Sequence, residues 1–139
     1  MSNLNTEYLQ RCLETLKKSY ELLKQAPKDS IDYEMYRNSL VKAFEMSIEQ
    51  SGKLLKKKLT PYFATKKAVD ALTFKDLFRY ANKHSLLNEN DVQRWFKYRD
   101  NRNSTAHDYG EQFAKETLIL IDDFIKDVEK LVQVVTNDK

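Results

Sequence analysis

Apolar side chains recur at steps of three and four residues along most of this 139-residue chain, which is the spacing of one face of an α-helix. Five segments follow this pattern, and none alternates apolar and polar residues with the period of two that a β-strand requires. The five helices are expected from about Asn5 to Gln25, from after Asp29 or Ser30 to before Pro61, from Thr73, after Asn88 and after Gly110. Amphipathic helices joined by short loops predict an all-α fold, an antiparallel up-and-down bundle of four to five helices.

Glycine and proline are scarce, with two of each in the chain, and this argues against an all-β fold with its many tight turns. Pro27 and Pro61 are expected to end the first and second helices, because proline disfavours helical geometry in the residue before it. Residues 61–72 are ambiguous and are expected to form a loop or loose turn. Ser51 and Gly52 interrupt the second helix, which indicates that another element packs closely there.

The starts of the third and fourth helices have recognisable signals. Thr73 and Asp76 have the spacing of a capping box. Asp91 lies early in the helix that follows Asn88, where the helix dipole favours an anion. Both signals support the predicted helix boundaries.

The length of the chain predicts a single domain over residues 1–139. Its longest strongly apolar run, 118–121, is far shorter than a membrane span, and the N-terminus shows no secretory signal. The single cysteine, Cys12, can form no internal disulfide and is expected to be a small core residue. These features predict a cytoplasmic protein with no membrane partner.

Positive charge is concentrated in the middle of the chain. Residues 53–102 hold thirteen Lys or Arg against five Asp or Glu, whereas residues 111–139 hold four against seven. The middle region could therefore face an anion such as a nucleotide phosphate or RNA. For the run Lys56-Lys57-Lys58 the simpler interpretation is a solvated helix face.

The helix after Asn88 carries arginines where its apolar stripe should continue. Arg99 and Arg102 follow Val92 and Trp95 at steps of three and four, so they are predicted on the same face. A guanidinium on a core-facing stripe is costly unless it is paired, hydrogen-bonded or lining a wet cleft. Two interpretations follow: the floor of a functional site, or a structural arginine that reaches solvent at the end of the bundle.

Arg102 is followed five positions later by His107, and this pair suits phosphoryl transfer within RNA. Histidine can take a proton from a 2′-hydroxyl near neutral pH, and arginine can stabilise charge on the phosphorus centre. Five residues on an ideal helix rotate by about 140°, so the two side chains would diverge. They converge if the helix breaks near Ser104 and Thr105, whose side chains favour a break, or if a second chain contributes its copies.

Metal and cofactor chemistry is not expected. Cys12, His84 and His107 give no ligand cluster at zinc spacing, and two glycines form no phosphate loop. His84 is expected to be exposed or to cap a helix. Cleavage by a nucleophile that belongs to the RNA itself requires no metal.

Two motifs resemble those of a known family. Arg102-Asn103-x-x-x-His107-Asp108-Tyr109 resembles the Arg-polar-x-x-x-His-x-Tyr signature of HEPN domains, which are helical proteins. The resemblance is to the branch called nucleotidyltransferase substrate-binding proteins. Its second-helix pattern, an aromatic–acid pair before an acid, a lysine and a leucine, is similar to Phe44-Glu45-x-x-x-Glu49-x-x-x-Lys53-x-Leu55-Lys56.

This resemblance covers about residues 40–130. Trp95 and the Ala-Lys-Glu of residues 114–116 also occupy places where the branch has similar residues. One departure is Gly52, because the branch usually has tryptophan just before that lysine, so packing beneath the site is expected to differ.

The resemblance implies a homodimer that brings two Arg-His motifs to one cleft, with RNA or a nucleotide as its ligand. On this interpretation Arg102 stabilises phosphate, His107 is the acid–base residue, and Asn103 orients one of them or contacts the phosphate. Arg99 assists at phosphate or pairs with Asp100 of the other chain.

The resemblance also implies a partner encoded nearby, a minimal nucleotidyltransferase. In such toxin–antitoxin-like pairs the HEPN chain is the toxin, regarded as a metal-independent ribonuclease, and the partner restrains it. In some pairs the partner transfers AMP to the tyrosine of the motif, which here would be Tyr109.

Two alternatives stay open. The family name casts the chain as a non-catalytic subunit that binds a nucleotide or another substrate for the nucleotidyltransferase. A purely structural helical adaptor would require Arg102 to lie in a salt bridge remote from any cleft.

Overall fold

The structure is a computed structural model that describes residues 4–105, 112 and 116–137, with the backbone alone for 103–105. These residues form six α-helices and two 3₁₀ turns, and no β-strand occurs among them. The elements are α1 (Glu7–Gln25), α2 (Ile31–Leu59), η1 (Thr60–Tyr62), α3 (Lys66–Asp70), α4 (Phe74–Lys83), α5 (Glu89–Thr105), η3 (Leu118–Leu120) and α6 (Ile121–Thr136). No helix in these ranges is both long enough and apolar enough to cross a membrane.

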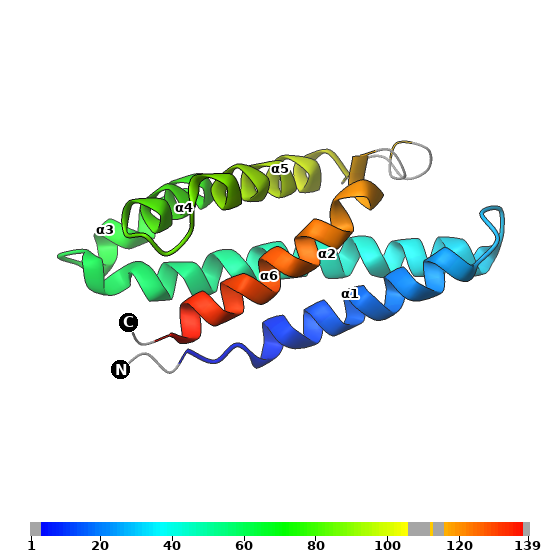
Figure 1. The fold of residues 1–139 in the computed structure, drawn as a ribbon, viewed down its shortest axis with the longest axis horizontal. Helices are drawn as coiled ribbons and strands as arrows, with labels where there is room; N and C mark the ends of the chain where they lie inside the picture. Colours follow the sequence, from blue (N-terminus) through cyan, green and yellow to red (C-terminus); the bar gives the residue numbers. More distant parts are fainter. Residues whose placement is uncertain (1–3, 106–111, 113–115, 138–139) are drawn as a thin grey trace.

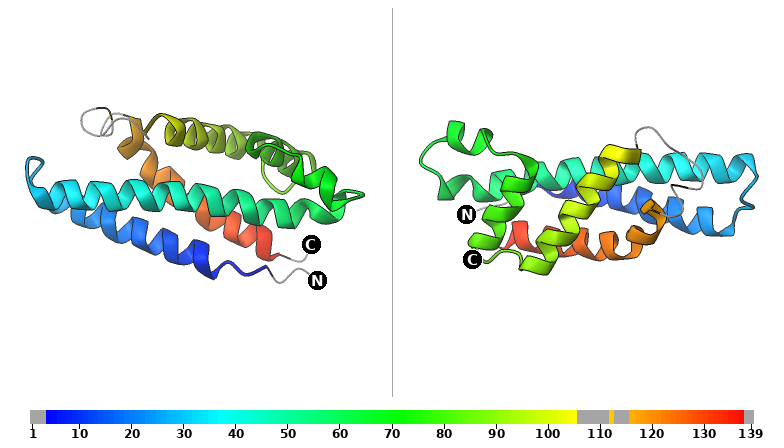
Figure 2. Two further views of the ribbon diagram at one scale, coloured as in Figure 1. Left: turned by 180° about the vertical axis from the view of Figure 1, so that it is seen from behind. Right: turned by 90° about the horizontal axis from the view of Figure 1, so that it is seen from above.

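The longest helix, α2, runs the length of the molecule and forms an antiparallel hairpin with α1 (Figure 1). α6 crosses α2 and comes close to α1, while α4 and α5 lie together along the opposite side (Figure 2). The start of α1 and the end of α6 lie at the same end of the bundle (Figure 1). This arrangement confirms the predicted all-α, up-and-down bundle.

Five aromatic side chains from α2, α4, α5 and α6 form the centre of the core, and all are fully buried: Phe44, Phe78, Trp95, Tyr98 and Phe124. The ring centroids of Phe44 and Phe124 are 4.7 Å apart, and those of Phe78 and Trp95 are 4.9 Å apart. Aromatic rings bury large apolar areas and add favourable edge and stacking contacts. This cluster holds α5 between α4 and α6.

Side-chain caps start several of the helices. Ser30 caps α2 through a hydrogen bond from the backbone N–H of Tyr33. Thr73 and Asp76 form the predicted capping box of α4, each side chain accepting from the other's backbone N–H at 3.1 Å. Asn88 and Asp91 make the same reciprocal pair at the start of α5, so the local sequence fixes where that helix begins.

The stretch expected as a loop, 61–72, contains more helix than predicted. Most of η1 and all of α3 fall within it. The hydroxyl of Thr65 caps α3 by accepting from the backbone N–H of Ala68, and Val69 is buried. A five-residue helix is too short to show a helical period in the sequence, which explains the difference.

Candidate functional site

The buried face of α5 continues through Tyr98 and Asn101, not through the predicted arginines. Val92, Trp95, Tyr98 and Asn101 are all buried, with Asn101 8% exposed. Arg99 and Arg102 lie along the edge of this face and are partly exposed. The prediction that they continue the core stripe was therefore wrong in detail, because helix steps of three from Trp95 place Tyr98 and Asn101 at the centre of the face.

Arg99 lies over an aromatic ring from α4. Its guanidinium carbon is 4.9 Å from the ring centroid of Phe74, a cation–π arrangement. Partial burial lowers the pKa of Arg99, and the charge of Arg102 lowers that pKa further, while Glu49 on α2 opposes the shift. The two guanidinium groups are therefore close enough to destabilise each other's charge.

Arg102 lies one turn further along α5, with about a third of its side chain exposed. Its Nη2 is 3.9 Å from Oε2 of Glu49, and the other carboxylate oxygen, Oε1, is 3.7 Å from Nζ of Lys53. The sequence motif around Glu49 and Lys53 on α2 and the arginine motif on α5 thus meet in space. We call Arg99, Arg102, Glu49 and Lys53 the arginine site.

Close packing beneath the arginine site accounts for Gly52. A Cβ atom at this position would lie 3.0 Å from Cδ2 of Phe74 and 3.1 Å from its Cε2. The expectation that an element packs closely at Ser51 and Gly52 is thus confirmed: the Phe74 ring of α4 occupies the space. The same ring carries Arg99.

Only part of the predicted site lies in the described residues. His107, Asp108 and Tyr109 lie outside them, as does the side chain of Asn103. The backbone of α5 remains helical through Thr105. Beyond the undescribed stretch the chain returns to α5 at Thr117, whose buried hydroxyl donates to the side-chain oxygen of Asn101 at 2.9 Å.

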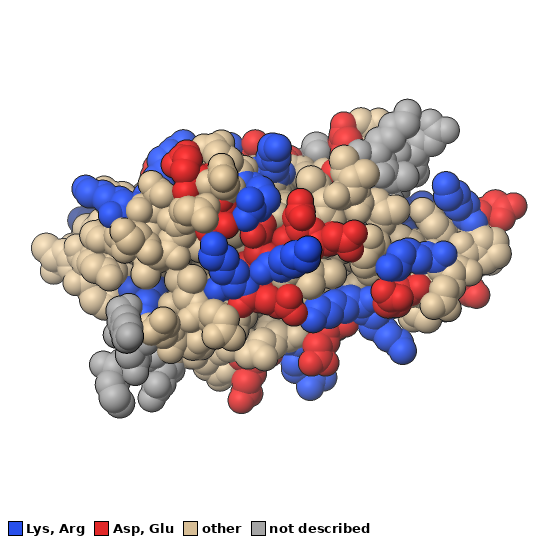
Figure 3. Space-filling view, in the orientation of Figure 1, with Lys and Arg blue, Asp and Glu red and all other residues tan. Residues whose placement is uncertain are grey.

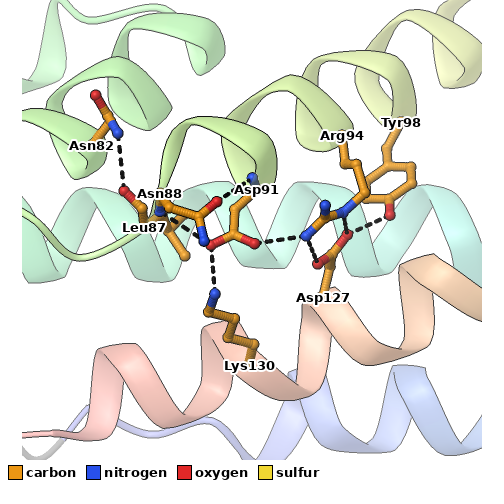
Figure 4. Close-up of polar contacts among 8 residues, drawn as sticks. All are labelled: Asn82, Leu87, Asn88, Asp91, Arg94, Tyr98, Asp127 and Lys130. Carbon is orange, nitrogen blue, oxygen red and sulfur yellow. Dashed lines mark hydrogen bonds and ion pairs between the residues drawn. The ribbon is translucent and has the colours of Figure 1, made fainter.

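A third arginine of α5, Arg94, was missed by sequence reasoning and forms the densest polar network of the described residues (Figure 4). Its Nε and Nη2 donate to the two oxygens of Asp127 on α6 at 2.8 and 3.0 Å, and Nη2 also donates to Asp91 at 2.6 Å. Lys130 donates to the other oxygen of Asp91 at 2.6 Å, and the Tyr98 hydroxyl donates to Asp127. We call these five residues the Arg94 network.

The Arg94 network is closed. The hydrogen bond to Asp127 raises the pKa of Arg94 above its already high value, and burial with the bond to Asp127 raises the pKa of Tyr98. Burial alone would raise the pKa of Asp91, but hydrogen bonds from Lys130 and the backbone lower it overall. The signal that could have revealed this network is Asp127, a carboxylate on the apolar face formed by Phe124, Val128 and Leu131.

Three further predictions can be compared with the structure. Cys12 is a buried core residue, and burial raises the pKa of its thiol, which lowers the fraction present as thiolate. His84 is the C-cap residue of α4, and its ring stacks on that of Tyr62 with the centroids 3.9 Å apart. Lys58 corrects the expectation of a fully solvated lysine run, because it is 8% exposed and its Nζ donates to the carbonyl of Asn137.

Within residues 4–105, 112 and 116–137, no group of three or more His, Cys, Asp and Glu side chains could hold a metal ion. The described part of the site holds two guanidinium groups, a lysine and an aromatic ring beside the carboxylate of Glu49. Positive charge exceeds negative charge there, which favours an anion as a ligand.

Comparisons with known proteins agree with this arrangement. The family model described as nucleotidyltransferase substrate binding protein like matches residues 5–137. A curated Haemophilus influenzae protein named probable ribonuclease HepT is 34% identical over 85 residues, which is 61% of this chain. The chain spans only 57% of the length of that relative.

Two solved structures share the fold. A Haemophilus influenzae protein, described as having the fold of a substrate binding domain of a nucleotidyltransferase, matches with a TM-score of 0.79 and 24% identity over 96% of this chain and all of that one. A protein from Thermus thermophilus matches with a TM-score of 0.73 and 22% identity over 93% of this chain and 99% of that one. Since the family model covers nearly the whole sequence, the chain belongs to the nucleotidyltransferase substrate binding protein-like family, the branch that its two motifs resembled.

Proposed function

We propose that this chain is the toxin subunit of a two-gene toxin–antitoxin pair and that it cleaves RNA without a metal. Arg102 stabilises the phosphate, His107 is the acid–base residue, Asn103 orients one of them or contacts the phosphate, and Arg99 assists at phosphate. The partner is a minimal nucleotidyltransferase that restrains the toxin.

One observation carries the proposal: Arg99, over the Phe74 ring, and Arg102, beside Glu49 of α2, lie one turn apart on α5, where burial and the repulsion from Arg102 lower the pKa of Arg99. A phosphate bound between them would relieve this repulsion and accept hydrogen bonds from both. Arg102 is also the residue from which the motif leads to His107. The name of the curated relative, probable ribonuclease HepT, supports the same reaction class.

The proposed active form is a homodimer. Two chains would bring two Arg-His motifs to one cleft, so that charge stabilisation and proton transfer come from different protomers. Sedimentation at micromolar concentration tests this point. A monomer that cleaves RNA would contradict the composite site.

The direct test is cleavage of RNA in the presence of EDTA by the purified protein and by His107→Ala. We expect the wild type to cleave and His107→Ala to lose about 100-fold or more of the rate, as is usual when an acid–base residue is removed. Equal cleavage by both proteins, or none by either across varied RNAs, would refute the catalytic assignment.

The second candidate is a non-catalytic subunit that binds a nucleotide or another substrate for the nucleotidyltransferase. The family description and the same cationic site favour it. Calorimetry with nucleotides and co-purification with the neighbouring gene product separate the two functions. A tight complex without RNA cleavage supports the binding subunit, whereas growth arrest on expression, relieved by the partner gene, supports the toxin.

Regulation by modification of Tyr109 belongs to the toxin proposal. A nucleotidyltransferase partner supplied with ATP and magnesium would form a phosphodiester between the tyrosine oxygen and the α-phosphate of ATP, releasing pyrophosphate and the phenolic proton. The added phosphate would compete with RNA for Arg102 and block the site sterically.

Intact-mass and peptide mass spectrometry after co-incubation test this step. We expect a mass increase of one or more AMP units on the peptide that contains Tyr109, with loss of RNA cleavage. A Tyr109→Phe protein that still gains the mass would show that the modified residue is another one.

A further inference from the structure

A second cationic surface lies along α2, beyond the arginine site. A hollow of about 310 Å³ opens between the C-terminal half of α2 and α3. Four lysines and one carboxylate are among the residues that line it: Lys53, Lys56, Lys57, Lys66 and Asp70. We call the four lysines the lysine track.

Two of the four track lysines, Lys56 and Lys66, share one carboxylate at the rim of this hollow. Nζ of Lys56 is 3.0 Å from one oxygen of Asp70, and Nζ of Lys66 is 3.2 Å from the other. Their hydrogen bonds lower the pKa of Asp70. Lys57 is exposed and has no ion-pair partner among the described residues, so positive charge exceeds negative charge in the hollow.

The lysine track begins at the arginine site. Lys53 contacts Glu49, and Glu49 contacts Arg102 on α5. Positions 49, 53 and 56 follow one another at helical steps on one face of α2, which covers about 10 Å at 1.5 Å per residue. Seen from behind in Figure 2, α2 runs through the middle of the molecule, with α4 and α5 on one side of it and α1 on the other.

Other lysines of the molecule differ from the track in how their charge is matched. Lysine, arginine and acidic side chains intermingle over the face drawn in Figure 3. Among the described residues, Lys17 pairs with Glu129 at 2.9 Å, and Lys130 pairs with Asp91 at 2.6 Å. In the track, Lys56 and Lys66 share the one carboxylate of Asp70.

The lining of the hollow favours a polyanion over a folded protein. Apart from Leu54, which is itself buried, its lining side chains are lysine, asparagine, glutamine, threonine and aspartate. Protein interfaces place aromatic and aliphatic side chains at their centre, and no such side chain is exposed in this hollow. Lysines repeated along a line fit the evenly spaced charges of a phosphate backbone.

We propose that the lysine track binds the phosphates of single-stranded RNA flanking the position that is cleaved at the arginine site. This inference rests on the proposed ribonuclease function. The RNA strand would run from Arg102 along α2 toward α3, and each lysine would neutralise at most one phosphate. The track contacts the backbone, so it would raise affinity for all sequences of sufficient length and leave sequence choice to other groups.

The test compares two double variants with the same change in charge. Lys57→Gln with Lys66→Gln removes two track lysines, and Lys17→Gln with Lys24→Gln removes two exposed lysines of α1. Both are made in the His107→Ala protein so that the RNA stays intact, and thermal melting verifies that each variant folds. Affinity for a single-stranded RNA of about 12 nucleotides is measured by fluorescence anisotropy across a salt series.

We expect the track variant to flatten the slope of log K against log salt by about 1.4, or about 0.7 for each phosphate that is no longer neutralised, and to weaken binding about 20-fold at about 0.1 M salt. The α1 variant should change both quantities far less. The proposal that the track binds RNA would be overturned if the two double variants had equal effects or if the slope were unchanged. It would also be overturned if the His107→Ala protein bound no RNA. Loss of complex formation with the nucleotidyltransferase at unchanged RNA affinity would overturn it in favour of a protein interface.

A length comparison separates this proposal from the ribonuclease proposal. With His107 intact, the track variant should cleave a trinucleotide as fast as the wild type but lose kcat/KM on the longer RNA. Equal loss on both lengths would overturn the track and leave the catalytic assignment in place. Absence of cleavage by the wild type would refute the ribonuclease, while the binding measurements would still decide whether the track holds RNA.

Discussion

The two halves of α5 use the same residue type in opposite ways. In the first half, Arg94 is paired with Asp91 and Asp127, and its pKa is raised by the hydrogen bond to Asp127. In the second half, Arg99 and Arg102 lie one turn apart, and burial and then the charge of Arg102 lower the pKa of Arg99. A cluster in which opposite charges neutralise one another is typical of a structural link between helices. Two neighbouring positive charges, by contrast, are stabilised when an anion binds between them. On the proposed function, the helix changes from a structural role at Arg94 to a phosphate-binding role at Arg99 and Arg102 within a few turns.

The difference also explains how the second half can be cationic at all. The Arg94 network joins α5 to α6, and the ring of Trp95 packs on Phe78 of α4. These contacts fix the rotation of α5 upstream of the arginine site. The free energy that these contacts contribute thus offsets the repulsion between Arg99 and Arg102.

The largest expected effect is a loss of stability when the Arg94 network, in the first half of α5, is broken. Asp127→Ala removes the carboxylate that accepts from Arg94 and Tyr98, and breaking such a buried set typically costs about 3–5 kcal/mol in the free energy of unfolding. Urea denaturation measures the loss. Glu129→Ala is the control, because Glu129 pairs with Lys17 at the exposed surface of α6, where an ion pair contributes at most about 1 kcal/mol. Similar losses in the two variants would contradict the division of α5 into two roles.

The next largest effect is on RNA cleavage, through the second half of α5, which carries Arg99 and Arg102. Arg102→Ala should lower the rate of RNA cleavage about 100- to 1,000-fold, the usual cost of losing a group that stabilises charge in the transition state. Its free energy of unfolding should change by at most about 1 kcal/mol, because relief of the repulsion from Arg99 opposes the loss of the contact with Glu49. Arg94→Ala should show the reverse pattern, with a large loss of stability. If Arg102→Ala unfolds as readily as Arg94→Ala, Arg102 is structural.

Acid should reduce the stability that Asp91 contributes through the Arg94 network. The pKa of Asp91 is lower in the folded protein than its unfolded value of about 3.9, so its contribution to stability is full above that value and is lost as the pH falls through the folded pKa. Asp91→Asn should cost about 2 kcal/mol at neutral pH, the range for hydrogen bonds to charged groups. Urea denaturation is measured from pH 7 down to about pH 3. The difference in free energy of unfolding between wild type and variant should become smaller below about pH 4. A gap that is independent of pH would exclude the charge of Asp91 as its source.

Much of the fold could be predicted because its signals are local. Period, proline positions and the Thr73 cap determine helices within a few neighbouring residues, and the structure confirms them. α3 escaped prediction because its five residues are too few for an apolar pattern of period 3.6 to repeat. The burial of Lys58 escaped because it depends on the far end of the chain, at Asn137.

The candidate site was predictable in part, for a related reason. The pattern selected Arg99 and Arg102 because a charged residue near an apolar stripe is a local signal, although the structure places both at the edge of that stripe. It did not reveal Arg94, whose partner Asp127 is 33 positions away, because pairing between helices leaves no mark at fixed spacing. The meeting of Glu49 with Arg102 likewise needed the packing of α2 on α5. The roles of His107, Asn103 and Tyr109 stay predictions.

The smallest expected effect concerns the packing beneath the second half of α5. Gly52→Ala gains up to about 1 kcal/mol of helix propensity, but the new Cβ would press on the Phe74 ring at 3.0 Å, so the change in stability should stay within about 1 kcal/mol. The ring is only partly buried and can shift by a few tenths of an ångström, and Arg99 lies over it. We therefore expect the variant to lose a few-fold in RNA affinity with little change in stability.

Ser51→Ala is the matched control on the adjacent residue, whose buried hydroxyl has no hydrogen-bond partner among the described residues. It should keep full RNA affinity and equal or exceed wild-type stability. If Gly52→Ala binds RNA as tightly as Ser51→Ala, the Phe74 ring does not position Arg99.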